Sequence, residues 1–107
     1  MNQLKYIQVT TTIDTKEAAE DLAGKAVESR FAACAQIIGP IESRYRWQGK
    51  FTEALEWRIV FKTRGSLYKA LEEFILSRHP YEVPEIIALP VISGSGDYLK
   101  WIDRETK

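Results

Sequence analysis

The clearest fold signal in this sequence is Arg44-Tyr45-Arg46-Trp47-Gln48-Gly49-Lys50-Phe51. Gln48-Gly49 predicts a two-residue hairpin turn, because glycine accepts the positive φ that such turns need. We expect one strand from Cys34 to Trp47 and its partner from Lys50 to Thr63, a stretch dense in large apolar and aromatic residues. Gly39-Pro40 interrupts the first strand. Since proline cannot donate a ladder hydrogen bond, we expect a bulge and a kink there, with the strand resuming at Ile41.

A strand and a helix are predicted before the hairpin. Residues Leu4 to Thr12 are rich in β-branched and aromatic side chains, which favour a strand. Asp14 and Glu17 have the spacing of a capping box, in which both side chains satisfy free backbone N–H groups. We therefore expect Asp14 to begin a helix over residues 15–30, with a narrow, alanine-rich apolar stripe that lies close to the sheet.

The pattern repeats after the hairpin. Gly65-Ser66 predicts the start of a second helix, whose apolar residues share one face and which ends before His79. A fourth strand is expected from Glu85 to Ile92, and a short terminal helix from Asp97 to Arg104. The order βαββαβ plus a C-terminal helix predicts an α+β, ferredoxin-like sandwich, in which an antiparallel sheet carries two helices on one face.

The two hairpin strands are unusually long. Each has about 14 residues, whereas a usual strand has about 5 to 6, and the first and fourth strands, at about nine residues each, are too short to pair along that length. The unpaired end carries large aromatic residues, namely Tyr45, Trp47, Phe51 and Trp57. An exposed ribbon of this kind invites association, so we expect another copy of the chain to cover it. The alternative is a hairpin that curls back over its own sheet.

Length and composition exclude several classes of protein. The chain has 107 residues, which we interpret as a single domain over residues 1–107. Its 15 basic and 15 acidic residues balance without a basic stripe, so a nucleic-acid surface is not expected. The apolar runs are too short to span a membrane, and Met1 to Lys5 does not open a signal peptide. One cysteine excludes an internal disulfide and fits a reducing compartment, so the cytoplasm is expected.

A proline-rich segment contains the only histidine: His79-Pro80-Tyr81-Glu82-Val83-Pro84-Glu85. Each proline fixes its own φ and biases the preceding residue towards an extended conformation. The segment is therefore expected to be a stiff connector into the fourth strand. Such a connector suits a binding site or an assembly contact, and its composition leaves both open.

Few residues carry recognisable chemistry. Neutral imidazole binds Cu, Zn and Ni, but His79 alone is not a site and needs Glu82, Glu85, Cys34 or a symmetry-related copy to complete one. Cys34 is interpreted first as a buried, small apolar residue. Arg44, Arg46, Lys62 and Arg64 are either an anion site in an intersubunit cleft or a solvated face. No phosphate loop or nucleophile motif occurs, so neither an enzyme nor an organic cofactor is expected.

With these motifs the sequence resembles the CutA family, which is linked to divalent-cation tolerance. The resemblance spans nearly the whole chain and rests on Ala32-Ala33-Cys34-Ala35, Tyr45-Arg46-Trp47-Gln48-Gly49-Lys50, Lys62-Thr63, His79-Pro80-Tyr81-Glu82-Val83-Pro84-Glu85-Ile86 and Tyr98-Leu99-Lys100-Trp101. It implies a tight homotrimer joined by the long hairpins, with an architecture similar to that of PII signalling proteins. It also implies copper tolerance and copper binding, as in bacterial members.

Two positions depart from the family pattern. Some members described as copper-binding have a cysteine near the end of the first strand and two adjacent histidines before Pro-Tyr, whereas this chain has Thr11 and Arg78 there. The resemblance therefore supports at most a weak site centred on His79.

Two functions follow as expectations. The first is a non-enzymatic cytoplasmic homotrimer that binds Cu(II) or another divalent cation at or near His79. The second is a PII-like trimer that binds a small anion or a protein partner between its subunits; a purely structural role with indirect metal effects also stays open. The residues expected at the intersubunit cleft or interface are Arg44, Tyr45, Trp47, Trp57, Tyr81, Glu82 and Glu85.

Overall fold

The computed structural model describes residues 4–107 and has the expected order of elements. The order βαββαβ plus a C-terminal helix is confirmed, with one additional 3-10 turn, η1, before the second helix. The elements are β1 (Tyr6–Ile13), α1 (Lys16–Glu28), β2 (Cys34–Trp47), β3 (Lys50–Arg64), η1 (Gly65–Leu67), α2 (Tyr68–Arg78), β4 (Ile87–Pro90) and α3 (Gly96–Glu105).

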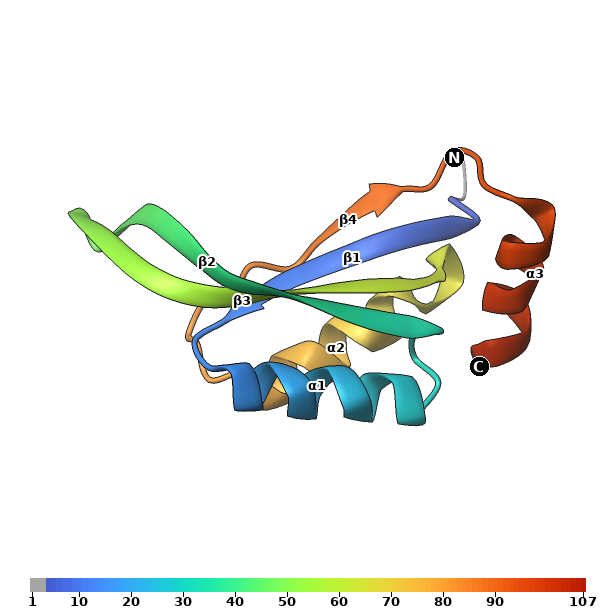
Figure 1. Ribbon diagram of the computed structural model, residues 1–107, viewed down its shortest axis with the longest axis horizontal. Helices are drawn as coiled ribbons and strands as arrows, with labels where there is room; N and C mark the ends of the chain where they lie inside the picture. The colour runs from blue at the N-terminus through green and yellow to red at the C-terminus, as the bar shows by residue number, and fades with distance from the viewer. Residues whose placement is uncertain (1–3) are drawn as a thin grey trace.

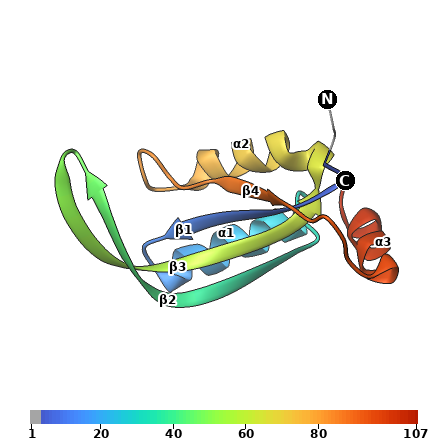
Figure 2. The same ribbon diagram turned by 90° about the horizontal axis from the view of Figure 1, so that it is seen from above.

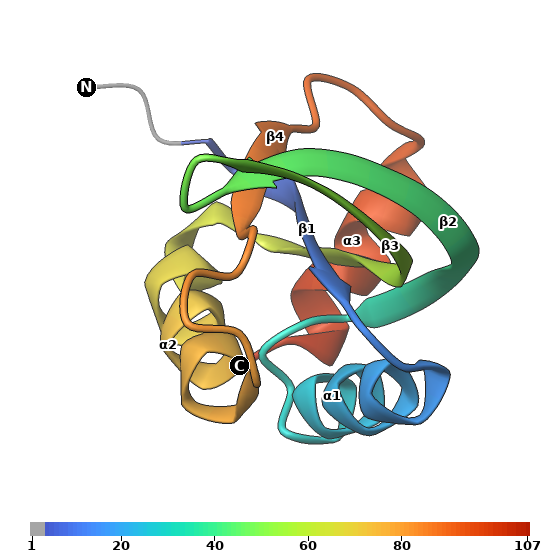
Figure 3. The same ribbon diagram turned by 90° about the vertical axis from the view of Figure 1, so that its left-hand side faces the viewer.

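The strands form one antiparallel sheet in the order β2-β3-β1-β4. Helices α1 and α2 lie side by side on one face of this sheet, and α3 lies beyond its end, close to the start of β1 (Figures 1 and 3). This two-layer arrangement is the ferredoxin-like α+β sandwich that the element order predicts. Among the described residues, no helix is long and apolar enough to cross a membrane.

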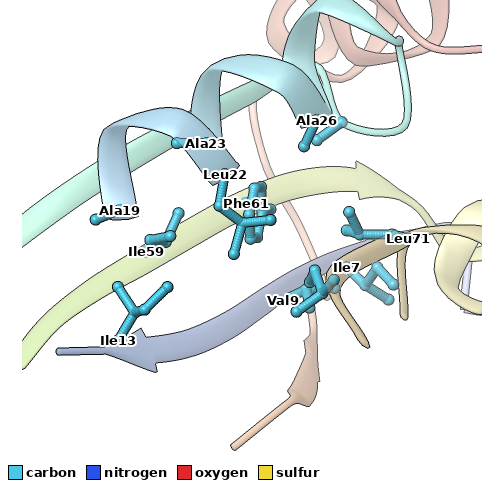
Figure 4. Close-up of a cluster of buried hydrophobic side chains, with 12 residues drawn as sticks. Ile7, Val9, Ile13, Ala19, Leu22, Ala23, Ala26, Ile59, Phe61 and Leu71 are labelled. Carbon is cyan, nitrogen blue, oxygen red and sulfur yellow. The ribbon is translucent and has the colours of Figure 1, made fainter. Parts of the chain in front are cut away.

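The core lies between the helices and the middle of the sheet (Figure 4). Side chains alternate between the two faces of a strand, so every second residue of β1 and β3 points towards the helices. Phe61 and Ile59 of β3 are fully buried there, and the predicted stripe of α1 packs onto them. Its members are Ala19, Leu22, Ala23 and Ala26. Alanine brings the helix backbone close to the sheet, as expected.

The long hairpin has the predicted register and the predicted kink. Strands β2 and β3 pair from Cys34 opposite Lys62 to Trp47 opposite Lys50, with a register shift between Ile38 and Ile41. The Gly39–Pro40 peptide bond within this shift is cis. At the tip, Gln48 and Gly49 have φ values of 51° and 78°, as a two-residue turn with a left-handed backbone requires.

Only part of the hairpin belongs to the sandwich. Strand β1 pairs with β3 from Trp57 to Arg64, so residues 50–56 of β3 pair with β2 alone. This far half projects beyond α1 and curves towards the connection between α2 and β4 (Figure 2). The prediction that the hairpin strands extend beyond the first and fourth strands is confirmed. The far half of the hairpin forms one open, curved end of the molecule.

Two helix starts differ from expectation. Asp14 does not cap α1; Thr15 is the N-cap, and its Oγ1 accepts a hydrogen bond from the backbone N–H of Ala18 at 3.1 Å. The helix ends at Glu28, two residues early, because the chain turns through a left-handed Arg30 with φ 65°. Gly65-Ser66 begins η1 rather than α2, and no side chain caps α2.

The C-terminal elements also have different bounds. Strand β4 has four residues, Ile87–Pro90, where the sequence predicted Glu85 to Ile92. Pro84 and Pro90 cannot donate ladder hydrogen bonds, and residues up to Ile86 form the connector instead. Helix α3 begins at Gly96, where the hydroxyl of Ser95 accepts the N–H of Tyr98 at 3.2 Å, and it continues to Glu105.

Candidate functional site

A groove of about 1000 Å³ lies between the far half of the β2–β3 hairpin and the connector that follows α2. Six of the seven residues expected at a cleft line it: Arg44, Tyr45, Trp47, Tyr81, Glu82 and Glu85. Residues 44–47 come from β2, and residues 81–85 from the connector. The seventh, Trp57, is not in the lining; its ring packs against the core and against Gly39.

The hairpin divides its side chains between two faces. Residues 43, 45 and 47 alternate with residues 42, 44 and 46, so Tyr45 and Trp47 face away from the side chain of Arg44. The guanidinium of Arg44 pairs with Glu42 at 3.2 Å and with Glu53 at 3.5 Å. These solvent-exposed ion pairs hold the guanidinium on the opposite face of the ribbon, which argues against an anion site centred on Arg44.

Tyr81 links the segment between α2 and β4 to the sheet by a hydrogen bond. Its hydroxyl donates a hydrogen bond to Oε2 of Glu56 at 2.8 Å. Burial, followed by this bond and the Glu56 charge, raises the pKa of Tyr81 far above its usual value. Glu56 is only 5% exposed, yet it lines the groove. The phenol thus stays protonated and fixes one wall of the groove.

Both ring nitrogens of His79 are engaged by the backbone. Nδ1 accepts the N–H of Tyr81 at 3.1 Å, so in the neutral ring Nε2 carries the proton and donates to the carbonyl oxygen of Thr12 at 2.8 Å. The ring also packs edge-on against Tyr81, with 4.7 Å between centroids. Burial lowers the pKa of His79, while its bond to Thr12 and the charges of Asp14 and Glu56 oppose this shift. In this arrangement the imidazole positions the connector.

The donors expected to complete a metal site are dispersed. Within residues 4–107 no three His, Cys, Asp or Glu side chains lie close enough together to hold a metal ion. Cys34 is partly exposed rather than buried, and its Sγ lies 3.7 Å from the hydroxyl of Tyr98. Thr11 is fully buried in the sheet, and the guanidinium of Arg78 lies over the ring of Phe74 at 4.9 Å. One subunit therefore does not fit a tight metal centre.

Sequence reasoning missed two acidic groups of the groove, Asp14 and Glu56. Asp14 was assigned to the cap of α1, but Thr15 performs that role and leaves the carboxylate of Asp14 at the groove. Glu56 carried a signal that we did not use, because it stands between Leu55 and Trp57 in a strand otherwise dense in apolar residues. Charged residues are almost never fully buried unless they are paired, so Glu56 within this apolar run indicates a polar partner.

Known proteins share this architecture over nearly the whole chain. The profile of the family described as "CutA1 divalent ion tolerance protein" matches residues 7–105. The crystal structure of CutA1 from Oryza sativa superposes with a TM-score of 0.94 at 41% identity, covering 98% of this chain and 96% of that one.

This chain matches two curated relatives over different shares of their own length. "Protein CutA, chloroplastic" of Arabidopsis thaliana is 42% identical over 94% of this chain, which spans only 56% of that relative. The divalent-cation tolerance protein CutA of Thermus thermophilus is 40% identical over 92% of this chain and 95% of its own length. Since the family profile and both relatives extend over nearly all of the sequence, the chain belongs to the CutA1 divalent ion tolerance family.

Proposed function

We propose that this chain acts in divalent-metal tolerance as a non-enzymatic, cytoplasmic homotrimer, with residues 1–107 as a single domain. Membership of the CutA1 family is the observation that carries this proposal. The relative from Thermus thermophilus, which is named for divalent-cation tolerance, is matched along 95% of its length. The compartment is inferred from the single cysteine, while the relative from Arabidopsis thaliana is named chloroplastic.

The trimer is supported by uncovered apolar surface on the hairpin. Phe51 is 63% exposed and Leu55 57%, although both belong to a paired strand. The sheet face away from the helices adds Ile38, Ile87 and Leu89, each about half exposed. A second copy that extends the sheet would bury these residues. Light scattering should give about three times the monomer mass of 12.3 kDa, and a mass near the monomer value would refute the trimer.

Metal binding is proposed at or near His79, with Cu(II) as the leading cation. His79 is the only imidazole in the chain, and the carboxylates of Asp14 and Glu56 are close enough to affect its pKa. A metal on either ring nitrogen would displace the contact with Thr12 or with Tyr81, at a cost of about 0.5–1.5 kcal/mol. The remaining ligands would come from a rearranged connector or from a neighbouring subunit, so we expect weak binding.

Calorimetric titration of Cu(II) tests this site directly. The titration is best made in a Cys34→Ser background, because a partly exposed thiol would bind and reduce copper by itself. His79→Ala should weaken copper binding, whereas Glu73→Gln, which removes an exposed carboxylate from α2, should leave it unchanged. Identical isotherms for His79→Ala and its parent would remove His79 from the proposed site.

The second candidate is a PII-like sensor or scaffold that binds a small anion or a protein partner between its subunits. The groove favours this candidate because about 1000 Å³ is ample for a small molecule. A thermal-shift screen of nucleotides, organic acids and peptides would detect such a ligand as a rise in melting temperature. The pairing of Arg44 with Glu42 and Glu53 argues against the anion version, so we expect the organic acids to give no shift.

A further inference from the structure

The lining of the groove carries more negative than positive charge. Its lining includes four carboxylates, from Asp14, Glu56, Glu82 and Glu85. Among the described residues of the lining, the only cations are Arg44 and Arg46. Arg44 pairs with two glutamates on the other face of the ribbon, and Nη2 of Arg46 donates to the carbonyl oxygen of Gly49 at 2.9 Å. The open space therefore faces an excess of negative charge.

Glu56 gives this negative charge a defined centre. Glu56 is only 5% exposed, and its exposed part lines the groove. Its Oε2 accepts the hydroxyl of Tyr81. Within residues 4–107, no group donates a hydrogen bond to its Oε1, and no Lys or Arg forms an ion pair with it. Because Oε1 is not among the fully buried unpartnered atoms, it is the part of this largely buried carboxylate that is open to a cationic donor from the groove.

Aromatic rings line the space around this carboxylate. Tyr45 and Trp47 lie on the hairpin wall and are about 40% exposed, and Tyr81 lies on the connector wall. Indole and phenol rings attract cations through their electron-rich faces, and they do so more strongly than they attract neutral groups. Carboxylate and aromatic walls together are suited to an ammonium or guanidinium group on a short carbon chain, because the carboxylate pairs with the charge and the rings contact the cation and its carbon chain.

We infer that the groove binds a small organic cation, an amine or guanidine on a short carbon chain, with Glu56 as its counter-charge and Trp47 and Tyr45 as its aromatic contacts. The same chemistry could be supplied by a lysine or arginine of another subunit. A groove of about 1000 Å³ is larger than one side chain needs, which favours a free molecule. The inference does not rest on copper binding at His79, although Tyr81 contacts both His79 and Glu56.

Titration of agmatine, which carries both an ammonium and a guanidinium group, tests the inference on the intact protein. Wild type should bind agmatine, and Glu56→Gln should weaken binding at least tenfold because it removes the counter-charge. Glu53→Gln is the matched control, since it removes a carboxylate from the same strand on the opposite face. It should bind like wild type. Glutarate, an anion of similar length, should not bind.

A second variant tests the inference in case Glu56→Gln does not fold. Trp47→Ala removes an exposed ring, should fold normally, and should weaken agmatine several-fold while copper titrations stay unchanged. The inference is overturned if agmatine fails to bind wild type, or if Glu56→Gln binds it as well as wild type does. If another subunit fills the groove instead, agmatine will not bind and Glu56→Gln will lower the oligomer mass by light scattering.

Discussion

The two halves of the β2–β3 hairpin have the same strands but opposite environments. In the near half, helices cover one face, and residues such as Ile59 and Phe61 are completely buried. In the far half, beyond the Gly39–Pro40 bulge, Phe51 and Leu55 are exposed on one face while Tyr45 and Trp47 line the groove on the other. Strand alternation therefore assigns a residue to a face, whereas the element packed on that face decides whether the residue is buried.

The largest expected effect comes from the near half. Phe61→Ala should lower the free energy of unfolding by about 3–5 kcal/mol, because it removes a fully buried ring from the centre of the core. Denaturant titration measures this loss. Phe51→Ala, in the same strand, should leave the folding of one subunit nearly unchanged, since a surface substitution costs less than about 0.5 kcal/mol.

Protein concentration should affect the two variants differently. If the far half is covered by another subunit, the stability loss in Phe51→Ala should shrink as protein concentration rises, because mass action restores assembly. The loss in Phe61→Ala should persist at every concentration. Equal losses in the two variants, with unchanged oligomer mass, would contradict the division of the hairpin into covered and uncovered halves.

The second prediction concerns the boundary between the halves. A Cβ atom on Gly39 would lie 2.5 Å from Cδ1 of Trp57, so Gly39→Ala must displace the indole ring. We expect a loss of about 1–3 kcal/mol, as for other overpacked sites, with altered tryptophan fluorescence. Gly24→Ala on α1 is the control, because nothing lies within 4 Å of its new Cβ, and it should stabilise by about 0.5–1 kcal/mol. Equal behaviour of the two variants would show that Trp57 does not constrain the kink.

Much of this fold follows from local sequence signals. The turn at Gln48-Gly49, the interruption at Gly39-Pro40 and the alanine stripe of α1 each act over a few residues, so each could be predicted. The cap of α1 was misplaced because Asp14 and Thr15 are both good capping residues. Only the backbone conformation at Thr15, which is extended and aims its hydroxyl at Ala18, decides between them.

The groove was predictable in its parts but not in its charge. Six of the seven residues expected at an intersubunit cleft or interface line one groove of a single subunit, and Trp57 does not. The predicted turn at Gln48-Gly49 places Glu53 opposite Arg44, but which of the nearby charges Arg44 pairs with depends on side-chain conformation. The role of Glu56 depends on a phenol 25 residues away in the sequence, a tertiary contact with no local signal.

The smallest expected effect is a pH dependence of the unfolding free energy caused by His79. Its ring lies at the start of the connector and bonds to the carbonyl oxygen of Thr12 in β1. Burial lowers the pKa of His79 in the folded protein. As pH falls through about 6.5, His79 is therefore protonated in the unfolded chain before it is protonated in the folded one. The stabilisation is therefore present above the unfolded pKa and is lost as pH falls below it. Protonation also removes the Nδ1 acceptor for the N–H of Tyr81. Between about pH 7.5 and about pH 5.5, wild type should lose more unfolding free energy than His79→Gln, which lacks this titration. Denaturant unfolding across that range measures the difference, and parallel curves would mean that the imidazole is equally free to protonate in both states.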